Sequence, residues 1–471
     1  MDFLNNLLLK DITNCLILGL TGYNIALLIY RLWLSPLSRF PGSRLAKATF
    51  WYEFYYDWVK PGQYYHRIHE MHKIYGPIIQ ITPNELHISD PSCYAKLFVT
   101  GAVRKSDSFP GYADGTGFED YAAMIHTHDD HRLIRAPAQQ YFSVSSLGQI
   151  ELEVVNCIRF LCQRLEGYKD MDKPFNMTYA LLALSTDAIS TALYEKPTNS
   201  LAEPNFNKAW FKMRKKGMGV IPLLASIPWP ARFVKITLLP KLVSTYIQSS
   251  GAMLQPPKGV KEAFGGTNRA EGSRKQFGQG IYKRGAQLVQ ESGIYHLSHT
   301  LHTIITHLAL NDNMCRALRN ELETIAEHSP ESPLSWQDLQ KLPYLDACIK
   351  EGLRKKQQTP ISMTTYWMHM DPEVFVDPYK FQPNRWLDFQ KNELIAEYFV
   401  PFGKGSRNCV GKNFAQMVMY HTLRELYQPG APNMQLFETD ANDVVPTHGY
   451  LFPLPSLDSE GVRLLIHSHR A

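Results

Sequence analysis

Ten residues near the carboxy terminus place a cysteine among glycines and an arginine in a pattern suited to holding a flat macrocycle. The run is Phe402-Gly-Lys-Gly-Ser-Arg-Asn-Cys-Val-Gly411, and helix-like sequence follows it. A thiolate at Cys409 can ligate iron, and glycine at Gly405 and Gly411 lets a ring approach the backbone. Arg407 can pair with an acidic substituent of that ring, and Phe402 can keep water from the sulfur. The alternative is a buried, inert cysteine beside a glycine-rich turn.

The rest of the composition excludes several classes of protein. The seven cysteines are odd in number and form no C-x-x-C pair, so the sequence predicts neither a disulfide framework nor a zinc cluster. It predicts that the protein resides in a reducing compartment. A net charge of +5 over 471 residues, without a basic stripe, gives no sign of nucleic acid as a partner. With 44% hydrophobic and 20% charged residues, the chain can bury a large core.

The amino terminus contains a candidate membrane anchor. Cys15 to Leu34 is an apolar run whose only charge is Arg31, and it is about long enough to cross ~30 Å of hydrocarbon as a helix. A cleaved signal peptide and a buried core helix are the alternatives. Trp33 beside Arg31 is typical of an interface. Basic residues gather at or just beyond this end of the span, whereas only Lys10 precedes it; they are Arg31, Arg39, Arg44 and Lys47. The positive-inside rule therefore leaves the body of the chain in the cytosol.

The pattern of the body predicts a mostly α protein with small β sheets. Tyr64 to Tyr75 is helix-like, and two short strands are expected at 78–82 and 85–88, around a Pro-Asn turn. Helical periodicity covers 147–194, 300–308 and 314–325, and a capping box at Ser335 and a helix starting at Pro343 follow. Residues 255–284 read as a loop. No phosphate loop and no dinucleotide fingerprint is present, so the chain itself is not expected to bind a nucleotide.

The cysteine run resembles a known family signature. Phe402, Gly405, Arg407, Cys409 and Gly411 match the pattern F-x-x-G-x-R-x-C-x-G of the cytochrome P450 family, and the chain resembles a fungal microsomal member. The resemblance implies the cytochrome P450 fold, haem b as the cofactor and Cys409 as the ligand of its iron. The other four residues of the signature are then expected to contact the haem.

Three further positions match the structural triad of that family. Glu351 and Arg354 fit its E-x-x-R pair, and Arg385 in Phe-Gln-Pro-Asn-Arg-Trp fits the third member. By resemblance, the triad holds the cysteine loop and takes no part in the reaction. E-x-x-R alone is a weak motif, and an ordinary surface ion pair at i,i+3 is the alternative. Two runs, 436–444 and 452–463, resemble the carboxy-terminal strands of the family.

His131 and Arg135 fall where the family places two side chains that bind haem propionates. Their i,i+4 spacing puts them on one face of a helix, as a shared target requires. The alternative is a solvated histidine and arginine on an exposed face.

The run that aligns with the family's oxygen-activating motif departs from it. Relatives carry an acid and an alcohol there, which relay protons, whereas this chain has Tyr295 and His296. These two residues are the candidate catalytic pair, and His296 could also reach the iron as a sixth ligand. The alternative is that His296 faces neighbouring helices and has no role in the reaction.

A second departure follows Arg354, where only five residues precede Pro360. Relatives have a longer connection there, with a strand that lines the substrate pocket. True divergence, loss of activity and an error in the predicted gene all stay open as explanations.

These observations predict a membrane anchor at residues 1–34, a proline-containing hinge at 35–50 and a single catalytic domain at 51–471. By resemblance, the protein is a haem-thiolate monooxygenase of the endoplasmic reticulum membrane with its catalytic domain in the cytosol. It is expected to oxidise a hydrophobic small molecule, such as a terpenoid or polyketide. Electrons come from NADPH through a partner cytochrome P450 reductase, because no dinucleotide fold is present. The alternative is a haem-binding pseudoenzyme that does not oxygenate.

Overall fold

A computed structural model describes ten stretches of the chain: residues 2–99, 107–109, 124–193, 197–219, 222–223, 293–328, 334–355, 363–387, 393–449 and 453–468. The predicted loop at 255–284 lies outside them. The chain forms two compact units. The amino-terminal unit comprises Met1–Cys93 and Pro360–Thr364, and the carboxy-terminal unit comprises Tyr94–Thr359 and Thr365–Ala471.

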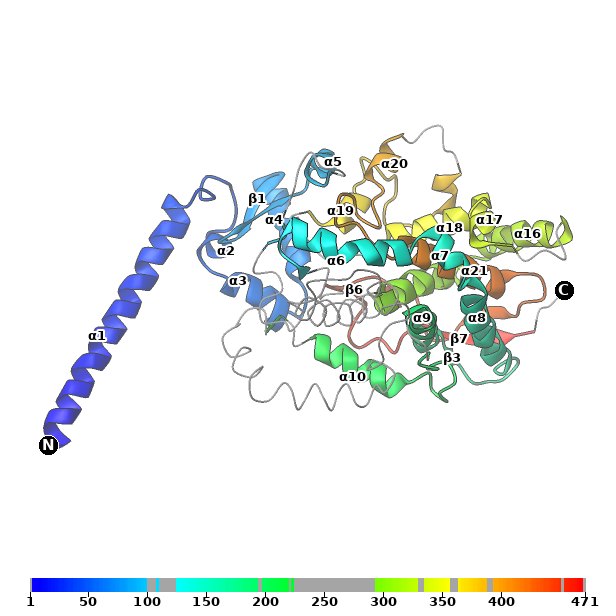
Figure 1. Cartoon of the computed structure of the whole chain (residues 1–471), viewed down its shortest axis with the longest axis horizontal. Coiled ribbons are helices and arrows are strands. Elements are labelled where there is room, and N and C mark those ends of the chain that lie inside the picture. The colour runs from blue at the N-terminus through cyan, green and yellow to red at the C-terminus, as the bar shows by residue number, and fades with distance from the viewer. Residues whose placement is uncertain are drawn as a thin grey trace, which may run out of the picture. The chain divides into compact units, whose positions relative to one another are not determined.

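The amino-terminal unit begins with a long apolar helix. α1 (Asp2–Ile29) continues into the π-helical turn η1 (Tyr30–Leu34), drawn in blue in Figure 1. Within the described residues, Lys10–Leu34 is the one helical stretch long and apolar enough to cross a membrane, and its most apolar window is not buried inside the protein. The helix ends where Ser35 turns to extended backbone, directly before Pro36. The helix thus ends at Leu34, and the anchor at residues 1–34 stays a prediction.

The remainder of the amino-terminal unit packs short helices on a two-stranded sheet. The predicted helix and both predicted strands are confirmed at their predicted bounds, as α4 (Tyr64–Tyr75), β1 (Ile78–Thr82) and β2 (Glu85–Ile88). The two strands pair antiparallel, and α4 buries its apolar stripe with β1 in a small core. The other elements are α2 (Arg44–Ala48), α3 (Trp51–Phe54), η2 (Tyr55–Val59) and η3 (Pro91–Cys93).

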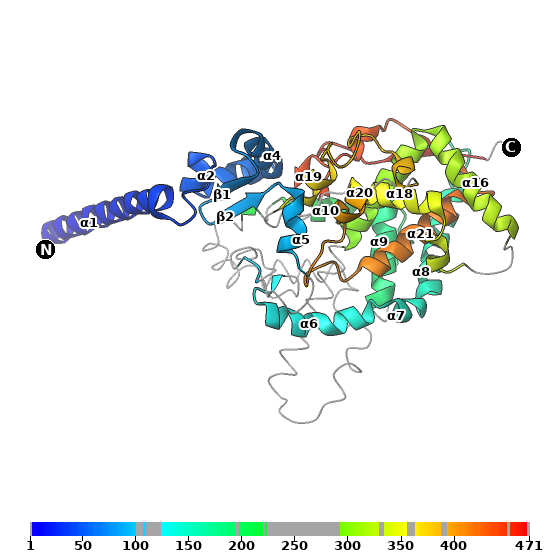
Figure 2. The ribbon, with the colours of Figure 1, turned by 90° about the horizontal axis from the view of Figure 1, so that it is seen from above.

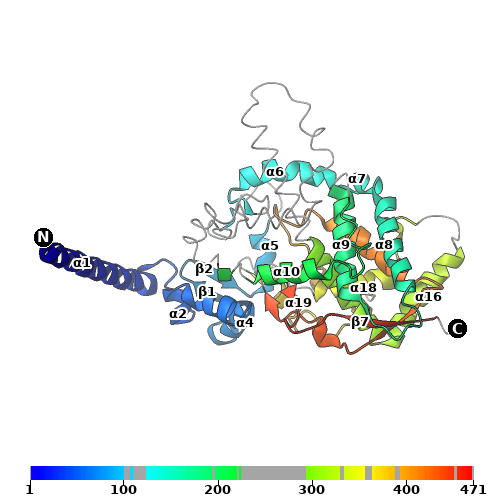
Figure 3. The ribbon, with the colours of Figure 1, turned by 90° about the horizontal axis from the view of Figure 1, so that it is seen from below.

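Two helices with almost no exposed surface form the centre of the carboxy-terminal unit. They are α9 (Met177–Leu193) and the helix over residues 293–309. α9 is apolar around most of its circumference, whereas the second helix also buries polar side chains, namely Ser298, His299, Thr300, His302, Thr303 and Thr306. α8 (Glu151–Glu166) packs against both α9 and α21 (Lys412–Tyr427), and Figures 2 and 3 show α8 beside α9. Gly352 lets α18 (Pro343–Arg354) approach the central helix closely, since a Cβ there would press on the Ile304 side chain.

Shorter helices complete this unit, so the mostly α fold class is confirmed. Pro343 begins α18 as predicted, and Ser335 caps its helix by accepting the Asp338 amide. The remaining helices are α5 (Tyr94–Leu97), α6 (His128–Tyr141), α7 (Val144–Gly148), α10 (Lys208–Met218), α16 (Asp312–His328), α17 (Trp336–Leu339), α19 (Thr365–His369), η5 (Pro383–Trp386), α20 (Glu393–Tyr398) and η7 (Ala441–Asp443).

The β structure of this unit differs from the sequence prediction in two ways. The helical run expected over 147–194 is interrupted by β3 (Phe175–Asn176), which pairs with β7 (Arg463–His467), and β7 pairs in turn with β4 (Asn433–Leu436). β5 (His448–Gly449) and β6 (Pro453–Leu454) form a separate pair. The runs 436–444 and 452–463 are therefore mostly turns, with strand residues only at their margins. Asp and Ser side chains in these runs cap the turns instead, as Asp440 does at η7.

Candidate haem-thiolate site

Cys409 lies on a tight loop that leads from α20 to the start of α21. The loop is closed by two backbone hydrogen bonds: the Gly403 amide donates to the Val400 carbonyl at 3.0 Å, and the Cys409 amide donates to the Phe402 carbonyl at 2.8 Å. The Cys409 side chain is exposed and sits just before the amino end of α21. The positive end of a helix dipole stabilises a thiolate at this position.

The two glycines of the signature have different surroundings. Gly405 has φ of +81°, and a Cβ there would lie 3.1 Å from the Phe98 carbonyl carbon and 3.2 Å from the Val99 carbonyl oxygen. Its small size thus serves backbone packing inside the protein. A Cβ at Gly411 would meet no described atom within 4 Å. Of the two, only Gly411 borders open space next to the sulfur-bearing residue.

α6 carries the two predicted propionate-binding side chains and runs beside the cysteine loop. The helix begins after Thr127, whose side chain accepts the Asp130 amide, and His131 and Arg135 lie one turn apart on it. His131 is buried, and the Arg135 guanidinium donates to the Asn408 side-chain oxygen at 2.5 Å. Asn408 precedes Cys409 in sequence, so this bond ties α6 to the cysteine loop.

Arg407 approaches α6 from the loop. Its Nη2 donates to the His126 carbonyl at 2.9 Å, just ahead of that helix. Its Nε and Nη1 are buried and find no hydrogen-bond partner among the described residues. A buried donor without an acceptor costs roughly 1–3 kcal/mol, and more when the group is charged. These two nitrogens therefore indicate that a group with hydrogen-bond acceptors binds beside them.

Three basic side chains thus gather beside the cysteine loop. Burial, and then the charges of Arg407 and Arg135, lower the pKa of His131 to about 4. Burial lowers the pKa of Arg407, with Asp107 opposing and Arg135 adding to the effect. Burial also lowers the pKa of Arg135, which the sulfur of Cys409 partly offsets. An anion between these groups would stabilise the charged form of each arginine.

These features fit a haem. Cys409 would ligate the iron, and Arg135, Arg407 and His131 would hold the propionates. The fit rests on the unpaired N–H groups of Arg407 and on the chemistry of this donor set. The assignments of Phe402 and Gly405 as haem contacts stay predictions.

The predicted triad is assembled around one buried carboxylate. Both oxygens of Glu351 accept from Arg354, at 2.7 and 3.0 Å, and Arg385 Nε lies 3.1 Å from Glu351 Oε2. Glu351 and Arg354 are fully buried, which excludes the alternative of a surface ion pair. Burial alone would raise the pKa of Glu351, but Arg354 and Arg385 together lower it.

Sequence analysis missed two further donors to this carboxylate. The Gln382 amide donates to Glu351 at 3.0 Å and the Trp386 indole N–H donates at 2.9 Å, both from the segment that ends in η5. The Phe-Gln-Pro-Asn-Arg-Trp run contains both residues, so its spacing was the available signal. The carboxylate is thereby satisfied from two elements, as burial of a charge requires.

His369 connects the triad to the cysteine loop and was also missed. Arg354 Nη1 donates to the His369 carbonyl at 2.8 Å, and His369 Nδ1 lies 3.2 Å from the Arg354 carbonyl. His369 Nε2 accepts the Val400 amide at 3.0 Å, at the start of the cysteine loop. Since one nitrogen donates and the other accepts, the ring is neutral. Burial lowers its pKa to about 3.

Tyr295 and His296 are positioned by a different element, the first turn of helix 293–309. Tyr295 is buried, and its ring lies 5.9 Å from the guanidinium carbon of Arg214 on α10. His296 is half-buried, and its carbonyl accepts the Thr300 hydroxyl at 3.0 Å. Their assignment as catalytic residues stays a prediction.

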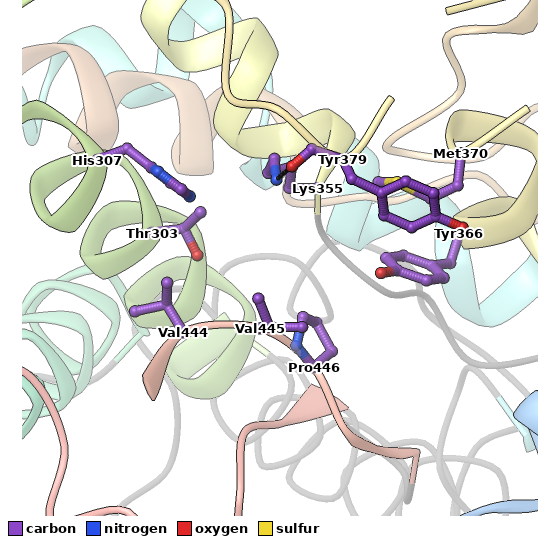
Figure 4. Close-up of a pocket in the computed structure, with 9 residues that line it drawn as sticks. All are labelled: Thr303, His307, Lys355, Tyr366, Met370, Tyr379, Val444, Val445 and Pro446. Atoms are coloured by element: carbon purple, nitrogen blue, oxygen red, sulfur yellow. Dashed lines mark hydrogen bonds between the residues drawn. The ribbon is translucent and has the colours of Figure 1, made fainter. Parts of the chain in front are cut away.

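A small pocket opens farther along the same helix. Thr303 and His307 continue the face that carries His296, since the spacing is i+7 and i+11. The pocket has a volume of about 110 Å³, too small for a multi-ring hydrocarbon, which needs roughly 300 Å³ or more. Figure 4 shows it between the helix, two tyrosines and a turn; its lining residues are Thr303, His307, Lys355, Tyr366, Met370, Tyr379, Val444, Val445 and Pro446. Burial lowers the pKa of His307 to about 4 and that of Lys355 to about 8.

Comparison with known proteins decides the family. The chain is 34% identical to the cytochrome P450 monooxygenase oblB of Cochliobolus heterostrophus, with 95% of each chain covered. It belongs to the cytochrome P450 family. The family model "Cytochrome P450" matches residues 293–364 and 356–428. Other relatives are the fusicoccadiene C-8 hydroxylase of Phomopsis amygdali (30% identical, 94% of each chain) and the stellatic acid synthase of Emericella variicolor (30%, 94% of this chain and 93% of the relative).

The comparisons bear on the two departures noted in the sequence. The alignment with oblB has 502 positions, more than the 471 residues of this P450, so it contains positions where this chain has no residue. The family model matches the chain in two segments that overlap at 356–364, and the short connection after Arg354 lies in this overlap. The relatives bear the names of monooxygenases, a hydroxylase and a synthase, and nothing among them favours the pseudoenzyme alternative. This P450 is accordingly an enzyme of the monooxygenase type.

Replacing Glu351 by glutamine should destabilise this P450 by about 3 kcal/mol or more, because two buried guanidinium groups lose their counter-ion. The measurement is urea unfolding of the detergent-solubilised protein, followed by circular dichroism. Asp377→Asn is the matched control: Asp377 pairs with Lys380 at the surface, so its loss should cost about 0.5 kcal/mol at most. Equal effects of the two variants would contradict a supporting role for the triad.

Acid should weaken the fold through His369. Its pKa falls from 6.5 in the unfolded chain to about 3 in the fold, so the unfolded state binds the extra proton between these values. Stability is then fully present above pH 6.5 and declines by up to about 1.4 kcal/mol per pH unit as the pH drops toward 3. Urea midpoints at pH 7 and pH 5 should differ less in His369→Gln than in the natural protein. An unchanged difference would show that another group causes the acid sensitivity.

Proposed function

We propose that this P450 is a membrane-anchored haem-thiolate monooxygenase that oxygenates a hydrophobic secondary metabolite. The supporting observation is the cysteine loop, with an exposed Cys409 beside the arginines of α6 and of the loop itself. Bound haem b supplies the oxygen-activating chemistry. The residues of the chain hold the group, shield it and handle protons.

The geometry supports the following role for each residue of the site. Cys409 would be the ligand of the iron, and α21 begins three residues after it. Arg407 and Arg135 bind the propionates, and His131 completes that side as a neutral donor. Glu351, with its two arginines, fixes the helix and turn that support the loop through His369 and Val400.

The proposed substrate is a terpenoid-like hydrocarbon. Support comes from the relative named fusicoccadiene C-8 hydroxylase, whose name denotes hydroxylation of an unsaturated hydrocarbon. A polyketide-like substrate is the alternative.

The proposed electron source is NADPH, through a cytochrome P450 reductase in the same membrane. The proposed membrane is the endoplasmic reticulum, with residues 1–34 as a single span, 35–50 as a hinge and 51–471 as the cytosolic catalytic domain. The apolar helix Lys10–Leu34 and the basic residues after it support this orientation.

Cys409→Ala should abolish the thiolate signature. The expected result is loss of the red-shifted Soret band in the reduced, carbon-monoxide-bound difference spectrum of the membrane-expressed protein. Cys315→Ala is the matched control, since Cys315 is half-buried on α16, and it should keep the band. A Cys409→Ala protein with an unchanged spectrum would end the assignment of this residue as ligand.

His296→Thr should couple oxygen use to product formation more tightly. A threonine restores the hydroxyl that the family places at this position, whereas an imidazole delivers a proton with a different geometry. The measurement is the ratio of hydroxylated product to hydrogen peroxide, with reductase, NADPH and a terpene hydrocarbon. His302→Thr, which lies six residues along and therefore on another face of the helix, should leave the ratio unchanged. An unchanged ratio in His296→Thr as well would show that position 296 does not control proton delivery.

A further inference from the structure

The pocket beside helix 293–309 has a polar side and an apolar side. Lys355, which directly follows α18, and His307 lie on one side of it, as Figure 4 shows. Residues 444–446, two valines and a proline between η7 and β5, lie on the opposite side. A ligand that fits both sides carries a polar group at one end and an apolar group at the other.

The Lys355 ammonium group has no ion-pair partner among the described residues. Its Nζ donates one hydrogen bond, to the Tyr379 carbonyl at 2.6 Å, and two of its three N–H groups remain for another acceptor. Burial lowers the pKa of Lys355 to about 8, so the group is mostly protonated at pH 7. Among the charges that act on it, Arg354 and Arg385 have the same sign and only Glu351 has the opposite sign. The polar side of the pocket is therefore positive, which favours an anionic ligand.

His307 adds a neutral polar group to the same side. Its ring stacks on that of Phe381 with 4.6 Å between the centroids, which holds the imidazole in one orientation. Burial, and then the charge of Lys355, lower the pKa of His307 to about 4, so the ring is neutral at pH 7. Its Nε2 is buried and has no hydrogen-bond partner among the described residues. When this nitrogen carries the proton, an acceptor bound in the pocket satisfies it.

The size and the apolar walls of the pocket suit a small organic ion. Its volume of about 110 Å³ is several times what one water molecule needs. Met370 and residues 444–446 provide walls without hydrogen-bonding side chains, and Val445 is 36% exposed, so the apolar side reaches the protein surface. An inorganic anion such as phosphate would lose hydration against these walls without gaining partners there. A short alkyl chain is instead stabilised by burial against them.

We propose that this pocket is a binding site for a short-chain aliphatic carboxylate, such as propionate or butyrate. The carboxylate group accepts from Lys355 and His307, and the alkyl chain lies against residues 444–446. Ammonium and carboxylate form a charge-assisted hydrogen bond, which is roughly twice as strong as a neutral one. The bound ligand connects the end of α18 to helix 293–309. The site lies apart from the cysteine loop, and the inference does not depend on the proposed oxygenation.

The test is a titration of the full-length, haem-loaded protein in detergent with butyrate, followed by saturation-transfer NMR of the butyrate methyl protons. Empty detergent micelles give the background. Butyramide has nearly the same shape without the charge, and inorganic phosphate has the charge without the alkyl chain. Butyrate should bind about tenfold or more tightly than butyramide, because only the carboxylate pairs with the ammonium group. Propionate should displace butyrate at lower concentrations than phosphate does.

Three variants assign the binding to this pocket. Lys355→Met keeps the length of the side chain without its charge and should weaken butyrate binding about tenfold or more. Lys380→Met is the matched control, because Lys380 pairs with Asp377 at the surface, and it should leave the affinity unchanged. Val445→Glu places a negative charge on the partly exposed apolar side and should also prevent binding. Urea midpoints without ligand show whether each variant folds like the natural protein.

Several results would overturn the proposal. They are the absence of saturable butyrate binding, equal binding of butyramide, displacement by phosphate as readily as by propionate, and equal losses in Lys355→Met and Lys380→Met. A change in the Soret band that butyrate still causes in Lys355→Met would place the ligand beside the haem and would overturn it as well. If Lys355→Met does not fold, Val445→Glu and the comparison with butyramide decide the question.

Discussion

The buried carboxylate of Glu351 organises the half of the molecule that carries the cysteine loop. The Arg354 guanidinium, a backbone amide and an indole donate hydrogen bonds to it, and Arg385 forms an ion pair with it, so its partners come from α18 and from the segment that ends in η5. A charge at this depth is tolerated only when its partners are held in place, so the segments that supply them cannot move independently. Arg354 also donates to the His369 carbonyl, and the His369 ring accepts the Val400 amide, so the triad is connected to the start of the cysteine loop. The position of the cysteine loop is thus set by a network that does not include Cys409 itself.

The cysteine loop and α6 complement each other electrostatically. Neutral His131, Arg135 and Arg407 converge from two elements, while the helix dipole of α21 acts on the sulfur from a third. Asn408 is a neutral link between helix and loop, and its bond to Arg135 sets the distance between them. This arrangement suits the proposed cofactor, which is flat and carries two carboxylates and a metal centre.

Local sequence patterns predicted those features whose cause is local. The bounds of α4, β1 and β2 follow from alternation and from the Gly-Pro and Pro-Asn turns, and α18 follows from Pro343. The signature around Cys409 identified the loop for the same reason, because ten adjacent residues carry it. The break between α8 and α9 was missed because Phe175 pairs with Leu464, far away in the sequence. His369, Gln382 and the close packing of Gly405 on Phe98 were missed because each depends on a contact between distant segments.

The unpaired nitrogens of Arg407 have a consequence for the life of the protein in a cell. A newly made chain that has not met its cofactor carries buried donors without an acceptor among the described residues, near the second guanidinium group of Arg135. Any group that binds only the folded state shifts the folding equilibrium toward it by mass action. The steady-state amount of this P450 should therefore follow the supply of iron and porphyrin, with cellular proteases removing whatever fraction of the chains is synthesised in excess of that supply.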